Sequence, residues 1–357
     1  MDRPGNATEV EHLIDEATLL IQRGDPEGAL ARAEAAFARS PGFAPALHAR
    51  AAALAQLGRF DEARLDYEVA LSRGDDDLGL ISDAADFFVN RLPGHFGDRR
   101  RSLERGLALA RRGQKLALRA KDELGVADFA LQQGMALSQL GEPKAALQML
   151  DVALSACPGD CDAMLERGFA LYDLCRFDEA REQFLEVVRA CDDSGWAHQV
   201  LGLIAERKGD VRQAERRFAL ARRLSPDEFP RPIELSPGEF DSAIEDALAA
   251  LPEQLRFYFS NVAIAVEDLP LEEDLLAADP PFPPSILGMF RGAPLGAKAS
   301  PDPWNHFPSS IVLYQKNLER VATDRQELIK QIGVTLIHEM GHFLGLDDDD
   351  LCERGLE

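Results

Sequence analysis

The chain has 357 residues, 46% of them hydrophobic, and a formal net charge of −23. This length allows two or three domains with sizeable cores, whereas the negative charge repels phosphate backbones and argues against a nucleic-acid partner. No stretch approaches the roughly 18 consecutive apolar residues of a membrane span, so we expect no membrane association.

The N-terminal stretch MDRPGNATEVEHLIDEA lacks the basic start and apolar run of a secretory signal. Five cysteines are an odd number for a disulfide framework and favour reduced thiols. Cys157 and Cys161 have the spacing of half a zinc site, but no second cysteine or histidine pair completes it. Together these features predict a cytoplasmic protein.

Five short segments in the first two thirds of the chain share one pattern. A turn residue is preceded by a small residue seven positions earlier and followed by an alanine five positions later. Three of the steps between successive turn residues are 34 residues long, and the turn residues are Gly24, Gly58, Gly141, Cys175 and Gly209. Small residues let two helices cross closely, so the pattern predicts a series of helix pairs.

This period and signature resemble the tetratricopeptide repeat over about residues 10–228. The resemblance implies a mainly α fold, an α-solenoid of stacked helix pairs, with a groove that binds a protein or peptide partner. Residues 78–126 break the rhythm and predict an irregular hairpin. We assign residues 1–230 to this repeat domain.

Four prolines between positions 225 and 240 end the repeat pattern, and a second domain is expected over 231–357. This part is the more acidic, with 9 Lys and Arg against 23 Asp and Glu. In chain order we predict a helix turned at Pro252, a strand in 261–270, a loop rich in proline and glycine over 277–310, a strand at 310–315 and a helix over 324–344.

The last predicted helix carries the motif His-Glu-x-x-His, followed by Gly345 and a run of four aspartates. His338 and His342 are four residues apart, so both rings project from one helix face and can hold one zinc ion. Glu339 is the expected general base. Gly345 would stop the helix and let the chain return, with Asp348 as third ligand and Asp347 in reserve. The alternative is that the two histidines only form surface hydrogen bonds.

The motif resembles that of the metzincins, with aspartate in place of the third histidine. Blocks over about 240–357, including LPEQLRFYFSNVAIAVEDLP and the segment from Ser309 through the motif, resemble the small "minimal zincin" metallopeptidase-like family. The resemblance implies a small α/β zincin-like domain, with a sheet packed on the motif helix. No methionine follows the motif, so the methionine turn of true metzincins is missing. Only fifteen residues follow His342, too few to expect a separate ligand helix.

The combination predicts a zinc-dependent peptidase, a hydrolase whose repeats recruit a protein substrate or regulator. The alternative is a non-catalytic scaffold whose zincin-like domain binds metal or peptide without turnover. An extended peptide substrate could pair with the edge of the strand at Ile311–Tyr314. Asn305 and His306 could orient that substrate, or could be ordinary loop residues.

Overall fold

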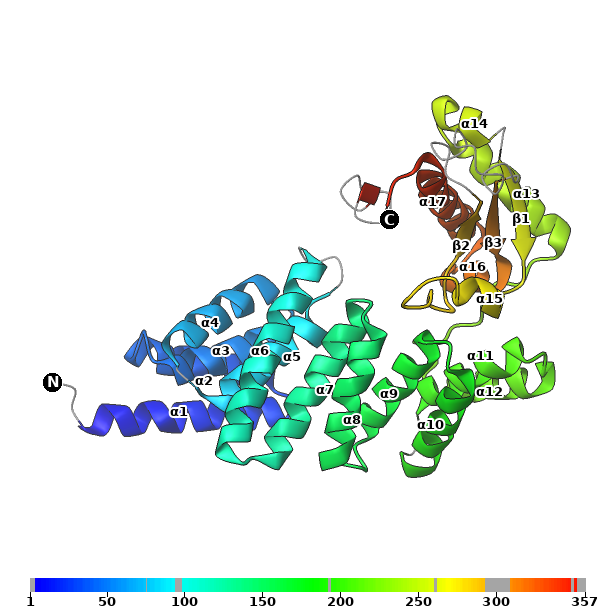
Figure 1. Ribbon diagram of the computed structural model, residues 1–357. Coiled ribbons are helices and arrows are strands. Elements are labelled where there is room, and N and C mark those ends of the chain that lie inside the picture. Colours follow the sequence, from blue (N-terminus) through cyan, green and yellow to red (C-terminus); the bar gives the residue numbers. More distant parts are fainter. Residues whose placement is uncertain are drawn as a thin grey trace. The chain divides into compact units, whose positions relative to one another are not determined.

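The computed structural model describes residues 4–74, 76–93, 98–191, 194–259, 262–292, 309–347 and 350–351, and every statement below concerns these residues. They form two compact units, Met1–Leu171 and Tyr172–Glu357. The first unit consists of helices, and the second combines helices with a small sheet (Figure 1). The predicted fold class, a helical solenoid followed by a small α/β part, is confirmed.

Helix pairs build the first unit. Its elements are α1 (Pro4–Gln22), α2 (Pro26–Arg39), α3 (Ala44–Gln56), α4 (Phe60–Arg73), α5 (Leu78–Asp86), the π-helical turn η1 (Phe87–Arg91), α6 (Arg99–Ala120), α7 (Glu123–Gln139), α8 (Pro143–Ala156) and most of α9 (Cys161–Asp173), which ends just inside the second unit. The irregular hairpin predicted over 78–126 corresponds to α5 with η1, and to the long helix α6. Alanines fill the contacts between paired helices, so the helices lie close together.

The predicted turn positions share one backbone conformation. The four glycines have φ between 72° and 77°, and Cys175 has φ 57°. At Gly141 the N–H donates to Ser138 O (3.0 Å), and the next N–H, of Glu142, donates to Leu137 O (2.9 Å). This is a Schellman ending, in which a left-handed residue satisfies the last carbonyls of a helix. The prediction that Gly141, Cys175 and Gly209 occupy equivalent turns is therefore confirmed.

The cysteines differ from the sequence expectation. Cys161 and Cys191 are disulfide-bonded, whereas Cys157 and Cys175 are free thiols. The prediction of reduced thiols throughout is therefore wrong, because an odd total does not prevent one bridge from forming. Cytosolic proteins rarely keep disulfides, and the cytoplasmic location stays a prediction. None of the described helices is both long and apolar enough to cross a membrane.

The second unit begins with the last repeat helices and continues into the sheet. Its helices are α10 (Phe177–Ala190), α11 (Gly195–Arg207), α12 (Val211–Leu224), α13 (Pro237–Ala250), α14 (Glu253–Phe259), α15 (Glu272–Leu275), α16 (Gln315–Val321) and α17 (Arg325–Leu344). The helix predicted to turn at Pro252 is the pair α13 and α14. Packing therefore divides the chain earlier than the end of the repeat pattern, and the domain boundary near 230 stays a prediction.

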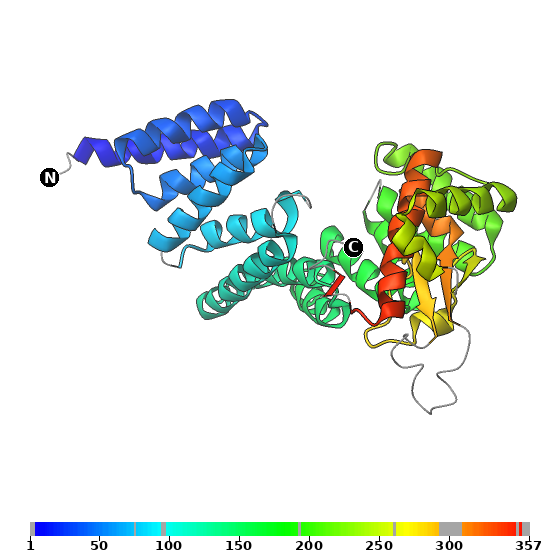
Figure 2. The same cartoon turned by 90° about the horizontal axis from the view of Figure 1, so that it is seen from above.

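Three strands form the sheet: β1 (Ala263–Glu267), β2 (Gly288–Arg291) and β3 (Ser310–Tyr314), in the order β1-β3-β2. β3 pairs parallel with β1 and antiparallel with β2. Figure 2 shows α17 lying along the strands. Apolar side chains of β3, α13 and α17 form the core, among them Phe240, Ile311, Leu313, Ile332 and Leu336.

Two sequence predictions fail in this sheet. The strand at Ile311–Tyr314 is β3, whose two edges are both occupied by neighbouring strands, so it cannot pair with a substrate peptide. β2 lies inside the segment that was predicted to be a loop. It has only four residues, begins with glycine and lacks a long alternating pattern, so the sequence signal for a strand is weak.

The left-handed turn residues give a stability test. Lys121, between α6 and α7, has φ 57° and is exposed. Lys121→Gly should stabilise the fold by up to about 1 kcal/mol, because a left-handed residue with a Cβ costs about 1–2 kcal/mol and glycine's extra chain entropy offsets part of it. Lys115→Gly, at an exposed position inside α6, should instead destabilise by about 1 kcal/mol. Thermal unfolding of the full chain compares them, and equal signs would contradict the prediction.

Candidate metal centre

Local signals fix both ends of the motif helix. The Asp324 side chain accepts hydrogen bonds from the N–H groups of Gln326 and Glu327, which caps the start of α17. The helix ends at Gly345, whose φ of 91° is left-handed, as the sequence predicted. One stripe of α17, including Ile332 and Leu336, faces the sheet and is fully buried. The motif residues therefore keep a fixed position relative to the core.

The two motif histidines converge. The Nε2 atoms of His338 and His342 lie 3.2 Å apart, and the ring centroids are 4.8 Å apart. His342 Nδ1 lies 3.0 Å from Leu346 O, the distance of a hydrogen bond in which Nδ1–H donates to the carbonyl. In a neutral His342 with its proton on Nδ1, the Nε2 atom carries the lone pair that can bind a metal ion.

This geometry fits zinc. Two imidazole nitrogens at 2.0–2.1 Å from a tetrahedral zinc ion would be separated by about 3.3–3.4 Å, close to the spacing present here. Metal-binding histidines usually donate the other ring N–H to a carboxylate or backbone carbonyl, which orients the ring. The Leu346 carbonyl plays this part for His342. A hydrogen bond from one Nε2–H to the other Nε2 gives the same 3.2 Å contact, so the alternative of two histidines that only form hydrogen bonds stays open.

No third ligand joins the two histidines among the described side chains. No group of three or more His, Cys, Asp and Glu residues suited to a metal ion occurs within the described residues. Asp347, the reserve ligand, accepts at Oδ1 a hydrogen bond from Asp350 N (2.8 Å), so its side chain is part of a local turn. Asp348 lies outside the described residues, as do Asn305 and His306. The assignment of Asp348 therefore stays a prediction.

Glu339 lies on the buried side of the motif, with 7% of its surface exposed. β2 approaches α17 closely at Gly288: a Cβ there would lie 2.6 Å from Thr335 Cγ2, 3.1 Å from Val312 O and 3.4 Å from Glu339 Cγ. Only glycine fits this contact without movement. Glycine at position 288 therefore brings the sheet against the helix at the position of the expected general base.

On the other face of the sheet, a charged contact holds β2 in place. Arg291, on β2, donates to both carboxylate oxygens of Glu267 on β1 (2.7 and 3.0 Å) and also to Asp274. The hydrogen bonds that Arg291 donates to Glu267 and Asp274 raise the pKa of Arg291, so it stays charged. Sequence analysis missed this arrangement, because it depends on the unpredicted strand and on residues from three separate elements.

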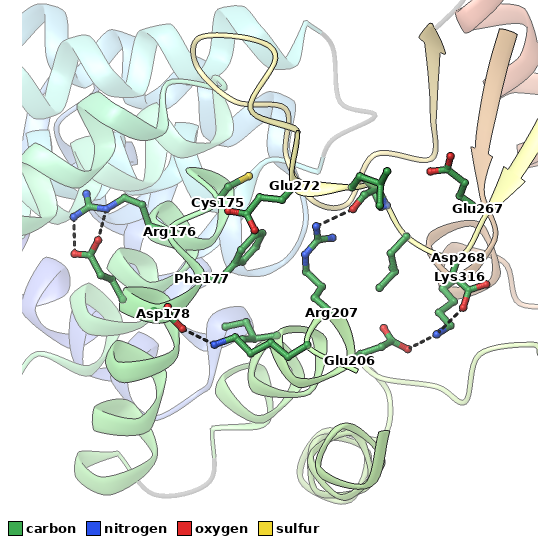
Figure 3. A pocket seen from close by; sticks show the side chains of 16 residues that line it. Cys175, Arg176, Phe177, Asp178, Glu206, Arg207, Glu267, Asp268, Glu272 and Lys316 are labelled. Carbon is green, nitrogen blue, oxygen red and sulfur yellow. Dashed lines mark hydrogen bonds and ion pairs between the residues drawn. The ribbon is translucent and has the colours of Figure 1, made fainter. Parts of the chain in front are cut away.

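A separate cavity of about 710 Å³ lies in the second unit, where α10 and α11 meet the segment after β1 (Figure 3). Its walls include Glu206, Arg207, Asp268, Glu272 and Lys316. Lys316 reaches both Asp268 (3.2 Å) and Glu206 (3.6 Å), and Arg207 donates to Pro270 O (2.8 Å). Because these contacts tie α11 to the segment after β1 and to the start of α16, we regard the cavity as a junction between the last repeat and the sheet.

The close approach at Gly288 can be tested by adding one methyl group. Gly288→Ala should destabilise the second unit by about 1–3 kcal/mol, the usual cost of overpacking, and shift β2 away from Glu339. Gly333→Ala is the matched control, because a Cβ at this α17 position meets nothing within 4 Å. It should be neutral or stabilise by up to about 1 kcal/mol. Thermal unfolding of both variants decides, and equal tolerance would refute the contact.

Comparisons with known proteins find different families for the earlier and later parts of the chain. The sequence model of a zincin-like metallopeptidase family matches residues 259–356, and two models of the tetratricopeptide repeat match 20–77 and 131–195. The stretch between the two repeat matches contains the irregular hairpin. No curated protein matches the chain in sequence.

Solved structures resemble the helical part. PilF of Pseudomonas aeruginosa is 16% identical, with a TM-score of 0.52 over 67% of this chain and 99% of that chain. PilW, a type IV pilus biogenesis factor, is 18% identical, with a TM-score of 0.51 over 63% of this chain and 96% of its own. Identities this low show a shared fold alone. The chain thus carries tetratricopeptide repeats followed by a zincin-like metallopeptidase domain.

Proposed function

We propose that the chain is a zinc-dependent peptidase whose repeats recruit a protein substrate or regulator. The observation that supports this most is the convergence of the His338 and His342 Nε2 atoms, 3.2 Å apart, on the helix that also carries buried Glu339. Two neutral imidazoles and an adjacent carboxylate are the side chains that zinc-assisted hydrolysis requires.

Each residue of the proposed site has a separate role. His338 and His342 hold the ion, with an aspartate of the 347–350 run as the proposed third ligand. A bound zinc ion would supply Lewis acidity toward a carbonyl oxygen and a water molecule. The Glu339 carboxylate accepts a proton from the water whose oxygen adds to the peptide carbonyl carbon. When the carbon–nitrogen bond breaks, Glu339 returns that proton to the departing amine.

The substrate peptide requires a free strand edge beside this site. β2 is an edge strand among the described residues, and its Gly288 faces Thr335 and Glu339 on α17. The substrate peptide is therefore proposed to pair with β2 and not with β3, because main-chain hydrogen bonds could hold an extended peptide there. The Arg291 contact to Glu267 would keep this edge rigid during binding.

A scaffold without turnover is the second candidate. Two observations favour it. The Asp347 side chain accepts a hydrogen bond from the Asp350 N–H, and no more than two candidate metal ligands converge among the described residues. Glu339 favours the enzyme, because a scaffold that only binds metal needs no general base. Zinc content and turnover distinguish the two.

Glu339→Gln separates metal binding from catalysis. Glutamine keeps the size of the side chain but cannot accept a proton, so the variant should retain zinc and lose peptidase activity by roughly a hundredfold to ten-thousandfold. His338→Ala should lose the zinc itself. Mass spectrometry of the purified proteins measures the metal, and cleavage of a peptide library measures turnover.

Each outcome has a clear meaning. Unchanged cleavage by Glu339→Gln would assign the activity to another site or a contaminant. Full zinc content in His338→Ala would refute the metal centre. Zinc bound at one equivalent without any cleavage, in the presence of a recruited partner, would support the scaffold.

A further inference from the structure

One apolar side chain fixes the chain that follows the motif helix back onto α17. Leu351 is fully buried. It packs against Gly341, the fourth residue of the motif: a Cβ at Gly341 would lie 2.4 Å from Leu351 Cδ2 and 3.3 Å from its Cγ. The leucine therefore occupies the space that a side chain at position 341 would need. We call this space the Gly341 notch.

The Gly341 notch lies on the histidine side of α17. Residues three or four positions apart share a face of a helix, so Gly341 lies beside His338. Successive residues differ by about 100° around the helix axis, which places Glu339 on the opposite flank of the stripe formed by His338 and His342. Leu351 therefore docks next to the two histidines, on the side away from the expected general base.

The end of the helix directs the chain toward this notch. The Leu346 N–H donates to Gly341 O (3.0 Å), and the Gly345 N–H donates to His342 O (3.0 Å). These two bonds form a Schellman ending like those of the repeats. The chain thus leaves α17 in contact with the backbone of Gly341 and His342, the residue of the notch and the second histidine.

A short turn leads from this helix end to Leu351. Asp347 Oδ1 accepts a hydrogen bond from the Asp350 N–H (2.8 Å), and Asp350 Oδ2 lies 3.4 Å from Asp347 N. The Leu351 N–H donates to Asp347 O (3.0 Å), which closes a helical turn. Two side chains that serve each other's backbone in this way resemble a capping box. A fixed Leu351 therefore also fixes these two aspartates.

The turn needs an anchor outside itself. Isolated helical segments far longer than this one are only marginally stable in water, so its hydrogen bonds alone cannot hold it. Glycine inside a helix is also unfavourable compared with alanine, but at position 341 the missing side chain makes room for a buried leucine. The burial of that leucine offsets the cost of the glycine and supplies the anchor.

We propose that Leu351 is a positioning residue of the metal centre. By filling the Gly341 notch it holds the acidic segment after Gly345 beside the two histidines, so that a carboxylate of this segment can complete the zinc site. This inference rests on the proposed zinc site and adds the contact on which its third ligand depends. Leu351 itself touches neither the ion nor a substrate. Without the contact only two ligands remain, fewer than the three that zinc usually takes from a protein.

The test measures zinc affinity in the full chain by competition with a chromophoric chelator. Leu351→Ala should raise the zinc Kd about 10–100-fold, the usual effect of removing a residue that orients a metal ligand. Leu351→Met should bind zinc nearly as tightly as the unmodified chain, because swaps that conserve volume are tolerated best. Should Leu351→Ala fail to fold, as judged by circular dichroism, Leu351→Val takes its place, with a smaller expected rise of the Kd.

The matched control is Leu275→Ala. Leu275 of α15 is equally buried, and its neighbour Asp274 belongs to the charged contact on the other face of the sheet. Both alanine variants leave a cavity and should lower the midpoint of thermal unfolding. Only Leu351→Ala should weaken zinc binding. Equal loss of zinc affinity in the two variants would reduce the effect to general instability and overturn the positioning role.

A double-mutant cycle tests the contact itself. In the unmodified chain, Gly341→Ala should displace Leu351, lower the unfolding midpoint and raise the zinc Kd. In the Leu351→Ala background the notch is empty, so the same Gly341→Ala change should raise the midpoint, because alanine favours a helix more than glycine does. A change of the same sign and size in both backgrounds would refute the contact.

Failure of this inference can be told from failure of the proposed function. If the unmodified chain binds one zinc ion and Leu351→Ala binds it as tightly, the zinc site stands and the positioning role falls. If Leu351→Ala loses affinity as expected but the unmodified chain cleaves no peptide, the positioning role stands and the peptidase proposal falls. If the unmodified chain binds no zinc, both fall.

Discussion

The helix α17 has to satisfy two demands at once, and the rest of the second unit follows from this constraint. One stripe of its side chains is buried against β3 and α13, while the stripe with His338 and His342 is only partly buried, as the proposed metal centre requires. Helical periodicity separates the two stripes without distortion. The glycine at position 288 then lets the sheet approach the boundary between them, where Glu339 lies.

Those features that depend on short stretches of chain could be predicted from the sequence. The spacing of Gly141, Cys175 and Gly209 predicted the turns correctly, because each residue adopts a left-handed backbone that depends only on its immediate neighbours. That His338 and His342 lie on one face of the helix also followed from local geometry, because they are four residues apart. The position of β3 in the sheet could not be predicted, since strand order is a long-range property and the sequence shows only that a segment is apolar.

β2 illustrates the limit most clearly. Its four residues carry little strand signal, and its location depends on the register with β3 and on the Arg291 contact to Glu267. The disulfide-bonded state of Cys161 and Cys191 was missed for a related reason, because pairing depends on which cysteines packing brings near each other. The proposed third metal ligand could not be assigned either, since the acidic run offers several equivalent carboxylates and spacing alone cannot choose one.

The last repeat and the sheet are not independent modules. Glu206 of α11 contacts Lys316 and Arg320 of α16, the helix that directly follows β3 and precedes the motif helix. The repeat pattern ends near residue 230, but the packing of the second unit already includes α10 to α12. A partner that changes the position of α11 would therefore act on the segment between β3 and α17.

The hydrogen bond between His342 Nδ1 and Leu346 O ties a ring to the chain just beyond its helix. Leu351 is fully buried and lies so close to Gly341 that a Cβ there would come within 2.4 Å of it, so the same stretch is also anchored by apolar contact. Order in this terminal stretch and the tautomer of His342 are thus thermodynamically linked. Release of Leu346 from this contact would expose Nδ1 to water, free the ring to rotate and thereby weaken the proposed metal centre.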